Sequence, residues 1–266
     1  MPELYGSDAY SPPQIAERVE QTGVAKANLG LIQLAALGML AGAFIGLGAL
    51  YYTLVVADPT LGFAASRVLG GVVFSLGLIL VVVAGAELFT GNNLMVMAWV
   101  SGMISGRLLL RNFFIVYFSN LFGAAGLAVL VACSGHWRMA EGGVGDQAVA
   151  IAQAKVALPW LEAFFRGILC NLLVCLAVWI AMGARTVAGK ILAIVFPISA
   201  FVAAGFEHCV ANMYFLPLGM LLAEPGSIPA SGLLANLLPV TLGNLVGGSV
   251  LVGLVYRLIY RHHESS

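Results

Sequence analysis

Long apolar segments separated by short polar turns run through most of the chain, and they predict an all-α membrane protein with six spans. Four of these segments have the usual length of a membrane helix, namely residues 29–57, 112–133, 158–182 and 233–260. The other two, 68–100 and 191–223, contain 33 residues each. As unbroken helices they would be about 50 Å long, against roughly 30 Å of membrane hydrocarbon. We therefore expect spans 2 and 5 to be broken into half-helices.

Polar residues recur in the middle of both overlong segments. Residues 85–92 and 205–212 both read G-x-E-x-x-x-x-N, 120 positions apart, and the pattern N-L-x-G at 120–123 returns at 244–247. The chain thus repeats itself as two groups of three spans. An odd number of spans in each copy gives the copies opposite orientations in the membrane. The pattern predicts an inverted repeat with a site between the two breaks.

The domain boundaries follow from these repeats. The transmembrane domain is expected at 29–260, with repeat one at 29–133 and repeat two at 158–260. Residues 1–28 lack the apolar stretch of a signal peptide, and Ser11-Pro12-Pro13-Gln14 is typical of a helix start with a capping box. We expect a cytoplasmic amphipathic helix in 1–28, which either anchors at the membrane surface or lies under a pore entrance. Residues 261–266 are expected to be a cytoplasmic tail.

Basic residues predict the orientation of the spans. Eight Lys and Arg residues fall on one side of the predicted spans and three on the other. Because basic residues concentrate in cytoplasmic loops, both termini are expected in the cytoplasm. The cytoplasmic residues are then Arg18, Lys26, Arg107, Arg111, Arg185, Lys190, Arg257 and Arg261, and the outer ones are Arg67, Arg138 and Lys155.

Composition narrows the class of protein further. The chain is 61% hydrophobic and 9% charged with a formal net charge of zero, which is typical of a membrane protein and gives no sign of nucleic-acid binding. Its four cysteines lack metal-type spacing, so we expect neither a metal site nor a cofactor. Gly38, Gly42 and Gly46 recur at every fourth position of the first span, and such a stripe predicts a surface where another helix packs closely.

Ionisable residues in the two broken segments are the candidates for chemistry. A lone histidine among apolar residues is more often a satisfied core residue, but His208 lies at a break that recurs in the other half, which favours a functional role. Thr90 occupies the equivalent break. Glu87 and Glu207 are interpreted as structural acceptors for backbone N–H groups that the breaks leave unpaired. Direct proton transport by either carboxylate remains the alternative.

Several of these segments resemble the signature sequences of the formate/nitrite transporter family. The resemblance covers nearly the whole chain and is carried by residues 86–90, 170–177, 205–208 and 211–213. Within that family, 51–53 and 215–220 are more similar to formate channels than to nitrite or hydrosulfide channels. The resemblance implies an aquaporin-like protomer in a bacterial inner membrane, assembled as a homopentamer with one substrate pore in each protomer.

The resemblance also implies roles for individual residues. His208 and Thr90 would lie in the loops of the two broken spans, with Asn171 as the partner of the central histidine and loop. Phe74 and Phe201 would be the apolar gates, with Leu78 beside the first. Lys155 and Lys26 would be vestibule lysines that attract anions. The implied function is pH-dependent passage of formate and similar small weak-acid anions, either as the anion or as the proton-coupled neutral acid, with His208 as the titrating group.

Other functions remain open at this point. A nitrite or hydrosulfide channel of the same family is the nearest alternative. An intramembrane hydrolase is remote, because the candidate nucleophiles Ser75 and Ser249 do not lie in a G-x-S-x-G motif and lack a carboxylate to orient a base. A water or glycerol channel would be expected to carry paired N-P-A motifs, which this sequence lacks. We therefore expect a transporter and not an enzyme.

Overall fold

The computed structural model describes residues 8–261, with side chains to residue 260. Within this range the protein is helical, and its one β-bridge joins Ala9 to Ala184. Five helical segments are long and apolar enough to cross a membrane, and they cover 31–56, 63–85, 106–134, 160–183 and 230–260. Two shorter apolar helices, Val187–Ala203 and Cys209–Leu222, complete the bundle. The predicted all-helical membrane architecture is confirmed.

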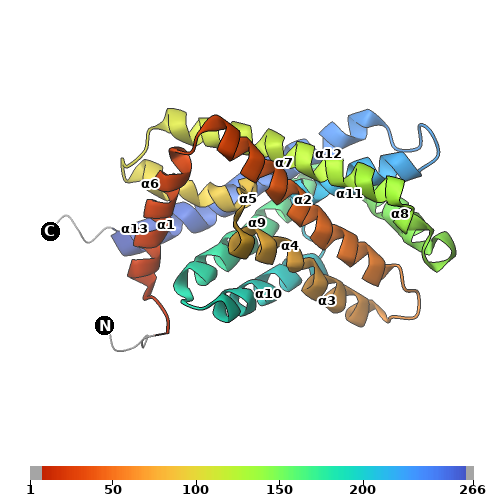
Figure 1. Cartoon of the computed structure of the whole chain (residues 1–266), viewed down its shortest axis with the longest axis horizontal. Helices are drawn as coiled ribbons and strands as arrows, with labels where there is room; N and C mark the ends of the chain where they lie inside the picture. Colours follow the sequence, from red (N-terminus) through yellow and green to blue (C-terminus); the bar gives the residue numbers. More distant parts are fainter. Residues whose placement is uncertain (1–7, 262–266) are drawn as a thin grey trace.

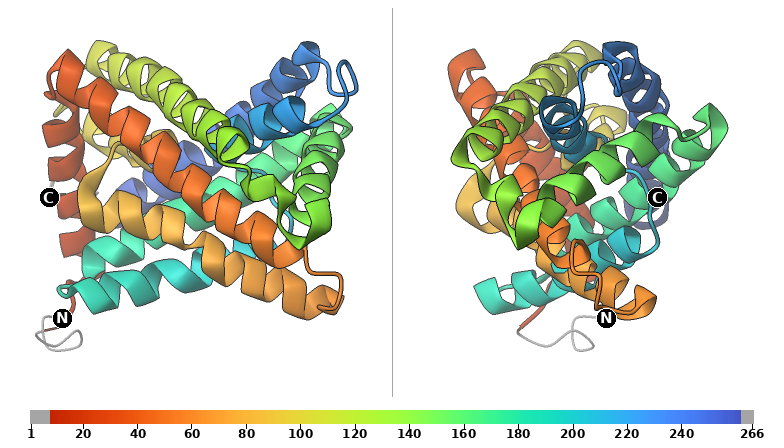
Figure 2. Two further views of the ribbon diagram at one scale, coloured as in Figure 1. Left: turned by 45° about the vertical axis from the view of Figure 1, so that its right-hand side comes forward. Right: turned by 90° about the vertical axis from the view of Figure 1, so that its right-hand side faces the viewer.

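The continuous spans form the frame of the bundle. They are α2 (Leu31–Val56), α7 (Gly106–Ser134), α9 (Trp160–Gly183) and α12 (Ala230–Leu245), the last of which continues through a π-helical stretch, Val246–Leu254, into α13 (Val255–Arg261). Helices α2 and α7 run side by side from one end of the molecule (Figure 2). The Gly38, Gly42 and Gly46 stripe faces α7, because a Cβ built on Gly42 would lie 2.0 Å from the carbonyl oxygen of Asn120. The predicted packing surface is confirmed.

Both overlong segments are broken, as predicted. The first contains α3 (Phe63–Phe74), α4 (Leu76–Ile79), a π-helical turn (Leu80–Gly85), α5 (Phe89–Asn92), a 3-10 turn (Asn93–Met95) and α6 (Val96–Val100). The second contains α10 (Val187–Ala203) and α11 (Cys209–Leu222). We call residues 86–88 the first break and 204–208 the second break. Gly85 and Gly205 enter the breaks with φ angles of +89° and +75°, a left-handed conformation that glycine adopts without steric cost.

Two shorter helices cover opposite ends of the bundle (Figure 1). Helix α1 (Pro12–Ala27) starts at Ser11, whose backbone N–H donates to Gln14 Oε1 at 2.9 Å, which is one half of the predicted capping box. Its apolar face packs into a cluster with Trp179 and Val252, so α1 is docked on the bundle. Helix α8 (Gly143–Val156) lies at the other end, within 134–157, between the two predicted repeats, where the sequence predicted no helix. Residues 262–266 of the predicted tail lie outside the described range.

Candidate functional site

The two breaks meet in the middle of the bundle at a pair of buried polar side chains. Thr90 lies in the first turn of α5, and His208 is the residue that caps the N-terminus of α11. Thr90 Oγ1 lies 2.9 Å from His208 Nε2, although the two residues are 118 positions apart in the sequence. The structure thus brings together the two residues that the sequence had placed at equivalent breaks.

Hydrogen bonding assigns the tautomer of His208. The backbone N–H of Ala211 donates to His208 Nδ1 at 3.1 Å, so Nδ1 carries no proton in this arrangement. The neutral ring then has its proton on Nε2 and donates it to Thr90 Oγ1. Because the Thr90 oxygen acts as an acceptor, the hydroxyl hydrogen of Thr90 is available to a further acceptor. An anion is such an acceptor.

The carboxylate of Glu87 holds the first break to the N-terminal helix. Lys26 of α1 contacts Glu87 Oε1 at 3.0 Å and Asn92 Oδ1 at 2.7 Å. Asn92 donates from Nδ2 to Glu87 Oε2 at 2.7 Å and to Asn112 Oδ1 at 2.9 Å. Asn112 in turn donates to the backbone carbonyl of Lys26 at 3.4 Å. The network therefore ties α1, the first broken span and α7 together.

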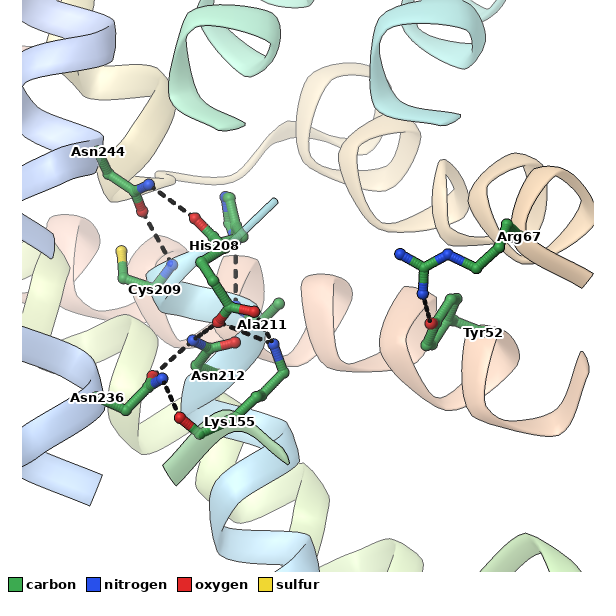
Figure 3. Close-up of polar contacts among 10 residues, drawn as sticks. Tyr52, Arg67, Lys155, His208, Cys209, Ala211, Asn212, Asn236 and Asn244 are labelled. Atoms are coloured by element: carbon green, nitrogen blue, oxygen red, sulfur yellow. Dashed lines mark hydrogen bonds and ion pairs between the residues drawn. The ribbon is translucent and has the colours of Figure 1, made fainter. Parts of the chain in front are cut away.

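The second break carries a network of the same composition (Figure 3). Lys155 of α8 donates to both oxygens of Glu207, at 2.9 and 3.0 Å. Asn212 donates to Glu207 Oε2 and to Asn236 Oδ1, each at 2.7 Å. Asn236 donates to the backbone carbonyl of Lys155 at 2.9 Å. Helix α8 thus does for the second break what α1 does for the first.

Two asparagines outside these networks hold the backbone of the breaks. The Asn120 oxygen accepts from the Phe89 N–H at 2.9 Å, and its amide donates to the carbonyl of Glu87, also at 2.9 Å. Asn244 does the same for the Cys209 N–H and the carbonyl of Glu207, at 2.9 and 3.0 Å. The sequence had marked both residues only as part of a repeat. In the part of the chain that the structure describes, these amides bond the backbone at the breaks and the two carboxylates accept from side chains instead, so the expectation that Glu87 and Glu207 bond free backbone N–H groups is wrong.

Asn171 bonds the backbone beside the central pair, at Thr90 of α5 and at Asn244 of α12. Its amide donates to the backbone carbonyl of Thr90 at 3.3 Å and to that of Asn244 at 2.7 Å, and it also contacts Asn93 Oδ1 at 3.2 Å. Asn171 therefore joins the two halves behind the Thr90–His208 pair. Within the described residues Asn171 forms no hydrogen bond with the ring of His208, the partner that the family resemblance implied.

Two cavities approach the Thr90–His208 pair from opposite ends. One cavity, of about 490 Å³, lies beside α1 and is lined by Lys26, Leu78 and Glu87 among others. We call it the inner cavity, and the other the outer cavity, after the orientation predicted from the basic residues. The outer cavity, of about 220 Å³, lies beside α8, and its lining includes Lys155, Glu207 and His208. Each predicted vestibule lysine lies in one of them, and each is ion-paired with a glutamate of a break.

The two phenylalanines that were predicted as apolar gates lie next to each other. Phe74 and Phe201 pack against each other with ring centroids 5.7 Å apart, and both line the outer cavity. They therefore form one constriction. Leu78, expected beside Phe74, lies one helical turn further on and lines the inner cavity. The ring of His208 stacks on that of Phe201 with the ring centroids 5.9 Å apart, so the histidine adjoins this constriction.

The outer cavity also contains a pair that sequence reasoning did not assign to the site. Arg67 donates from Nε to the carbonyl of Ala203 at 2.9 Å and from Nη1 to Tyr52 Oη at 3.2 Å. From the sequence, Arg67 is predicted only as a basic residue on the outer side of the membrane. The available signal was its position four residues after the start of an apolar half-helix, where its side chain can follow the helix into the cavity.

The surroundings of the two candidate serines argue against an intramembrane hydrolase. Ser75 donates to the carbonyls of Gly71 and Val195, at 3.2 and 3.4 Å. Ser249 donates to the carbonyl of Asn93 at 3.3 Å. Both hydroxyl groups are therefore engaged by backbone oxygens, and within the described residues neither is bonded to a histidine that could act as a base.

Comparison with known proteins agrees with this arrangement. The sequence profile of the formate/nitrite transporter family matches residues 13–258. The formate channel FocA of Escherichia coli (strain K12) is 40% identical over 271 residues, covering 95% of each chain, and that of Haemophilus influenzae is 38% identical over 275 residues, covering 97% of each. A solved structure of a pentameric formate channel with formate bound superposes with a TM-score of 0.81 at 38% identity, covering 87% of this chain and 98% of that one. This chain therefore belongs to the formate/nitrite transporter family, a family of transporters and not of enzymes.

Proposed function

We propose that the protein is a pH-dependent channel for formate in a bacterial inner membrane. The single observation that carries the proposal is the Thr90–His208 pair, buried between two cavities and behind the Phe74–Phe201 constriction. It offers neutral hydrogen-bond donors to a small anion in an otherwise apolar place. The names of the relatives favour formate, and nitrite or hydrosulfide is the alternative within the family.

The apolar constriction favours passage of the neutral acid. A bare anion must shed its hydration to pass Phe74 and Phe201, which is costly in an apolar environment. In the proposed cycle, the imidazolium form of His208 gives its Nε2 proton through the Thr90 hydroxyl to formate, which leaves as formic acid. The ring is then neutral with its remaining proton on Nδ1. It returns to the resting tautomer when Nε2 takes a proton from the opposite cavity and Nδ1 releases its own proton to that cavity, so that the Ala211 N–H bonds Nδ1 again. Charging Nδ1 breaks its bond to the Ala211 N–H, so the imidazolium is a transient state.

The matched networks support an inverted repeat. Lys26, Glu87, Asn92 and Asn112 in the first half correspond in type and bonding to Lys155, Glu207, Asn212 and Asn236 in the second. Helix α1 then belongs to repeat one as α8 belongs to repeat two, and both are structural caps on their breaks. The domain boundaries shift accordingly, because residues 12–27 are part of the channel unit. Six spans follow when α10 and α11 are counted as one broken span.

The quaternary structure and topology are proposed on separate grounds. The similarity to a pentameric formate channel supports a homopentamer with a pore in each protomer. The distribution of Lys and Arg supports cytoplasmic termini, so that the cavity beside α1 opens to the cytoplasm and the cavity beside α8 to the outside. Protons, formate and lipid are then the partners of the protein.

Uptake measurements test the proposed function. The purified protein is reconstituted in liposomes, and uptake of labelled formate is measured at external pH 5 and pH 7, with nitrite and hydrosulfide as competing substrates. We expect formate uptake above that of empty liposomes, with greater accumulation when the outside is acidic. Uptake of nitrite or hydrosulfide without formate would transfer the assignment to that branch of the family. Uptake of none of the three would refute the proposal.

A further inference from the structure

Most of the basic residues that line the outer cavity are neutralised by a carboxylate. Lys155 donates to both oxygens of Glu207. Arg166 pairs with Glu162 at 3.0 Å on the surface of α9. The acceptors of Arg67, in contrast, are the neutral carbonyl of Ala203 and the hydroxyl of Tyr52. Within the described residues Arg67 forms no ion pair, so it supplies the uncompensated positive charge of this cavity.

The inner cavity shows the same division of roles. Lys26 is paired with Glu87 at 3.0 Å and bonded to Asn92. Lys190, near the start of α10, also lines this cavity and forms no ion pair within residues 8–261. Each cavity therefore combines one lysine that is committed to a break with one cation that is not paired. An anion that enters either cavity is attracted chiefly by the unpaired cation.

Arg67 is fixed at the start of the path that ends at His208. Its bond to Ala203 anchors the guanidinium on the C-terminal end of α10, and a Cβ built on Gly205 would lie 2.7 Å from Nη2. The ring of Tyr52 contacts Phe74 at 6.5 Å between centroids, and Phe74 contacts Phe201. Figure 3 shows the Arg67–Tyr52 pair set apart from the cluster around Lys155. The pair thus lines the same cavity as the constriction and adjoins it through the contact between Tyr52 and Phe74.

The pair has unused donors that match a small planar oxyanion. A guanidinium has five N–H donors, and two of those of Arg67 are used in the bonds to Ala203 and Tyr52. Because the Tyr52 oxygen accepts from Arg67, its own hydroxyl hydrogen remains available. Guanidinium groups bind carboxylates through two parallel hydrogen bonds. Formate and nitrite each present two oxygens on one atom, whereas hydrosulfide does not.

We propose that Arg67 and Tyr52 form an outer capture site for small planar oxyanions, that Lys190 plays the corresponding part in the inner cavity, and that Lys155 and Lys26 are structural ion pairs. This inference rests on the proposed function for the identity of the anion. It revises the expectation from the sequence that Lys155 and Lys26 are the residues that attract anions. Capture at Arg67 raises the concentration of the anion at the constriction. Thr90 and His208 then serve only in the transfer of the proton.

Side-specific titration of formate flux tests the assignment. Wild type and variants are inserted in planar bilayers, and formate is varied on one side at a time. Arg67→Gln is expected to raise the half-saturating concentration from the outer side by roughly fivefold to tenfold, with little change from the inner side. Lys190→Gln is the matched control and should do the reverse. Arg67→Lys keeps the charge but loses the forked pair of donors, so its outer half-saturating concentration should lie between those of wild type and Arg67→Gln.

The dependence of the half-saturating concentration on ionic strength distinguishes anion capture from a purely structural role of Arg67. The wild-type half-saturating concentration from the outer side should rise with added inert salt, and Arg67→Gln should lose this dependence. If Arg67→Gln is poorly assembled, Tyr52→Phe replaces it and should raise the outer value by about twofold, one lost hydrogen bond being a small effect. An Arg67→Gln channel with an unchanged outer value, or with equal changes from both sides, would overturn the proposal.

The same measurement separates this inference from the proposed function. If wild type conducts nitrite but not formate, the formate assignment fails, and the titrations are repeated with nitrite, which the capture site accepts equally. If wild type conducts formate and only Lys155→Gln shifts the outer half-saturating concentration, the proposed function holds and the capture site is wrong.

Discussion

Replacing Lys155 with methionine is expected to damage stability more than substrate affinity. The change keeps most of the length of the side chain and removes its charge. Glu207, whose side chain is 8% exposed, then loses both bonds from Lys155 and keeps one side-chain donor, Asn212. Leaving a buried charge without its partner typically costs about 3–5 kcal/mol. That loss is large enough to lower the yield of the folded protein.

The double variant Lys155→Met with Glu207→Gln distinguishes pairing from other effects. It removes the isolated charge, and the neutral amide of glutamine can still bond Asn212. Since replacing both members of a buried pair is often close to neutral, most of the lost stability should return. Lys190→Met is the matched control, because Lys190 is unpaired and half-buried, and a change of less than about 0.5 kcal/mol is expected.

The assay is thermal denaturation of the purified protein in detergent, alongside formate flux in liposomes. We expect a lower midpoint for Lys155→Met, recovery in the double variant, and an unchanged midpoint for Lys190→Met. The reasoning is refuted if Lys155→Met keeps the wild-type midpoint while its outer half-saturating concentration rises several-fold. Lys155 would then act on the anion directly, as the sequence alone had suggested.

Three further predictions test the role of His208, the packing of α2 on α7, and the orientation of the chain in the membrane. His208→Asn should abolish formate accumulation driven by a proton gradient while passive anion flow persists, measured with labelled formate in liposomes; undiminished accumulation would make Glu207 the next candidate for the proton. Gly42→Ala should sharply reduce the yield of assembled protein in size-exclusion chromatography, since its Cβ would lie 2.0 Å from the Asn120 oxygen, whereas Gly126→Ala, which meets nothing within 4 Å, should not. A reporter active only outside the cytoplasm should be silent after Ser266 and active within 134–157, and the opposite result would reverse the topology.

The sequence predicted the features of the fold that are local in the chain. A 33-residue apolar segment is too long for one membrane helix, and a Glu inside it requires a partner, so the breaks at 86–88 and 204–208 were readable from length and polarity. The glycine stripe on α2 was readable from its spacing. Helix α8 was missed because the glycines at its start are typical of a loop and its apolar positions are weakly periodic.

The features that depend on tertiary contacts could not be read in the same way. Lys155 and Glu207 are 52 residues apart, and only the packing of α8 on α11 shows that they neutralise each other. Phe74 and Phe201 come from different halves of the chain, so their contact in one constriction depends on how the halves pack together. Arg67 looked like a loop residue because its role depends on Tyr52 and on the end of α10.

The placement of charge along the proposed path follows from the requirements of conduction. A channel must bind its substrate strongly enough to admit it and weakly enough to release it. An unpaired cation at the midplane would hold a desolvated anion too tightly, because electrostatic attraction is strong in a medium of low dielectric constant. At the breaks both lysines are paired with glutamates, and the central donors, Thr90 and His208, are neutral in this arrangement. The unpaired cations Arg67 and Lys190 line the two cavities and are partly exposed, so their attraction is weaker than at the midplane and they can collect anions without trapping them.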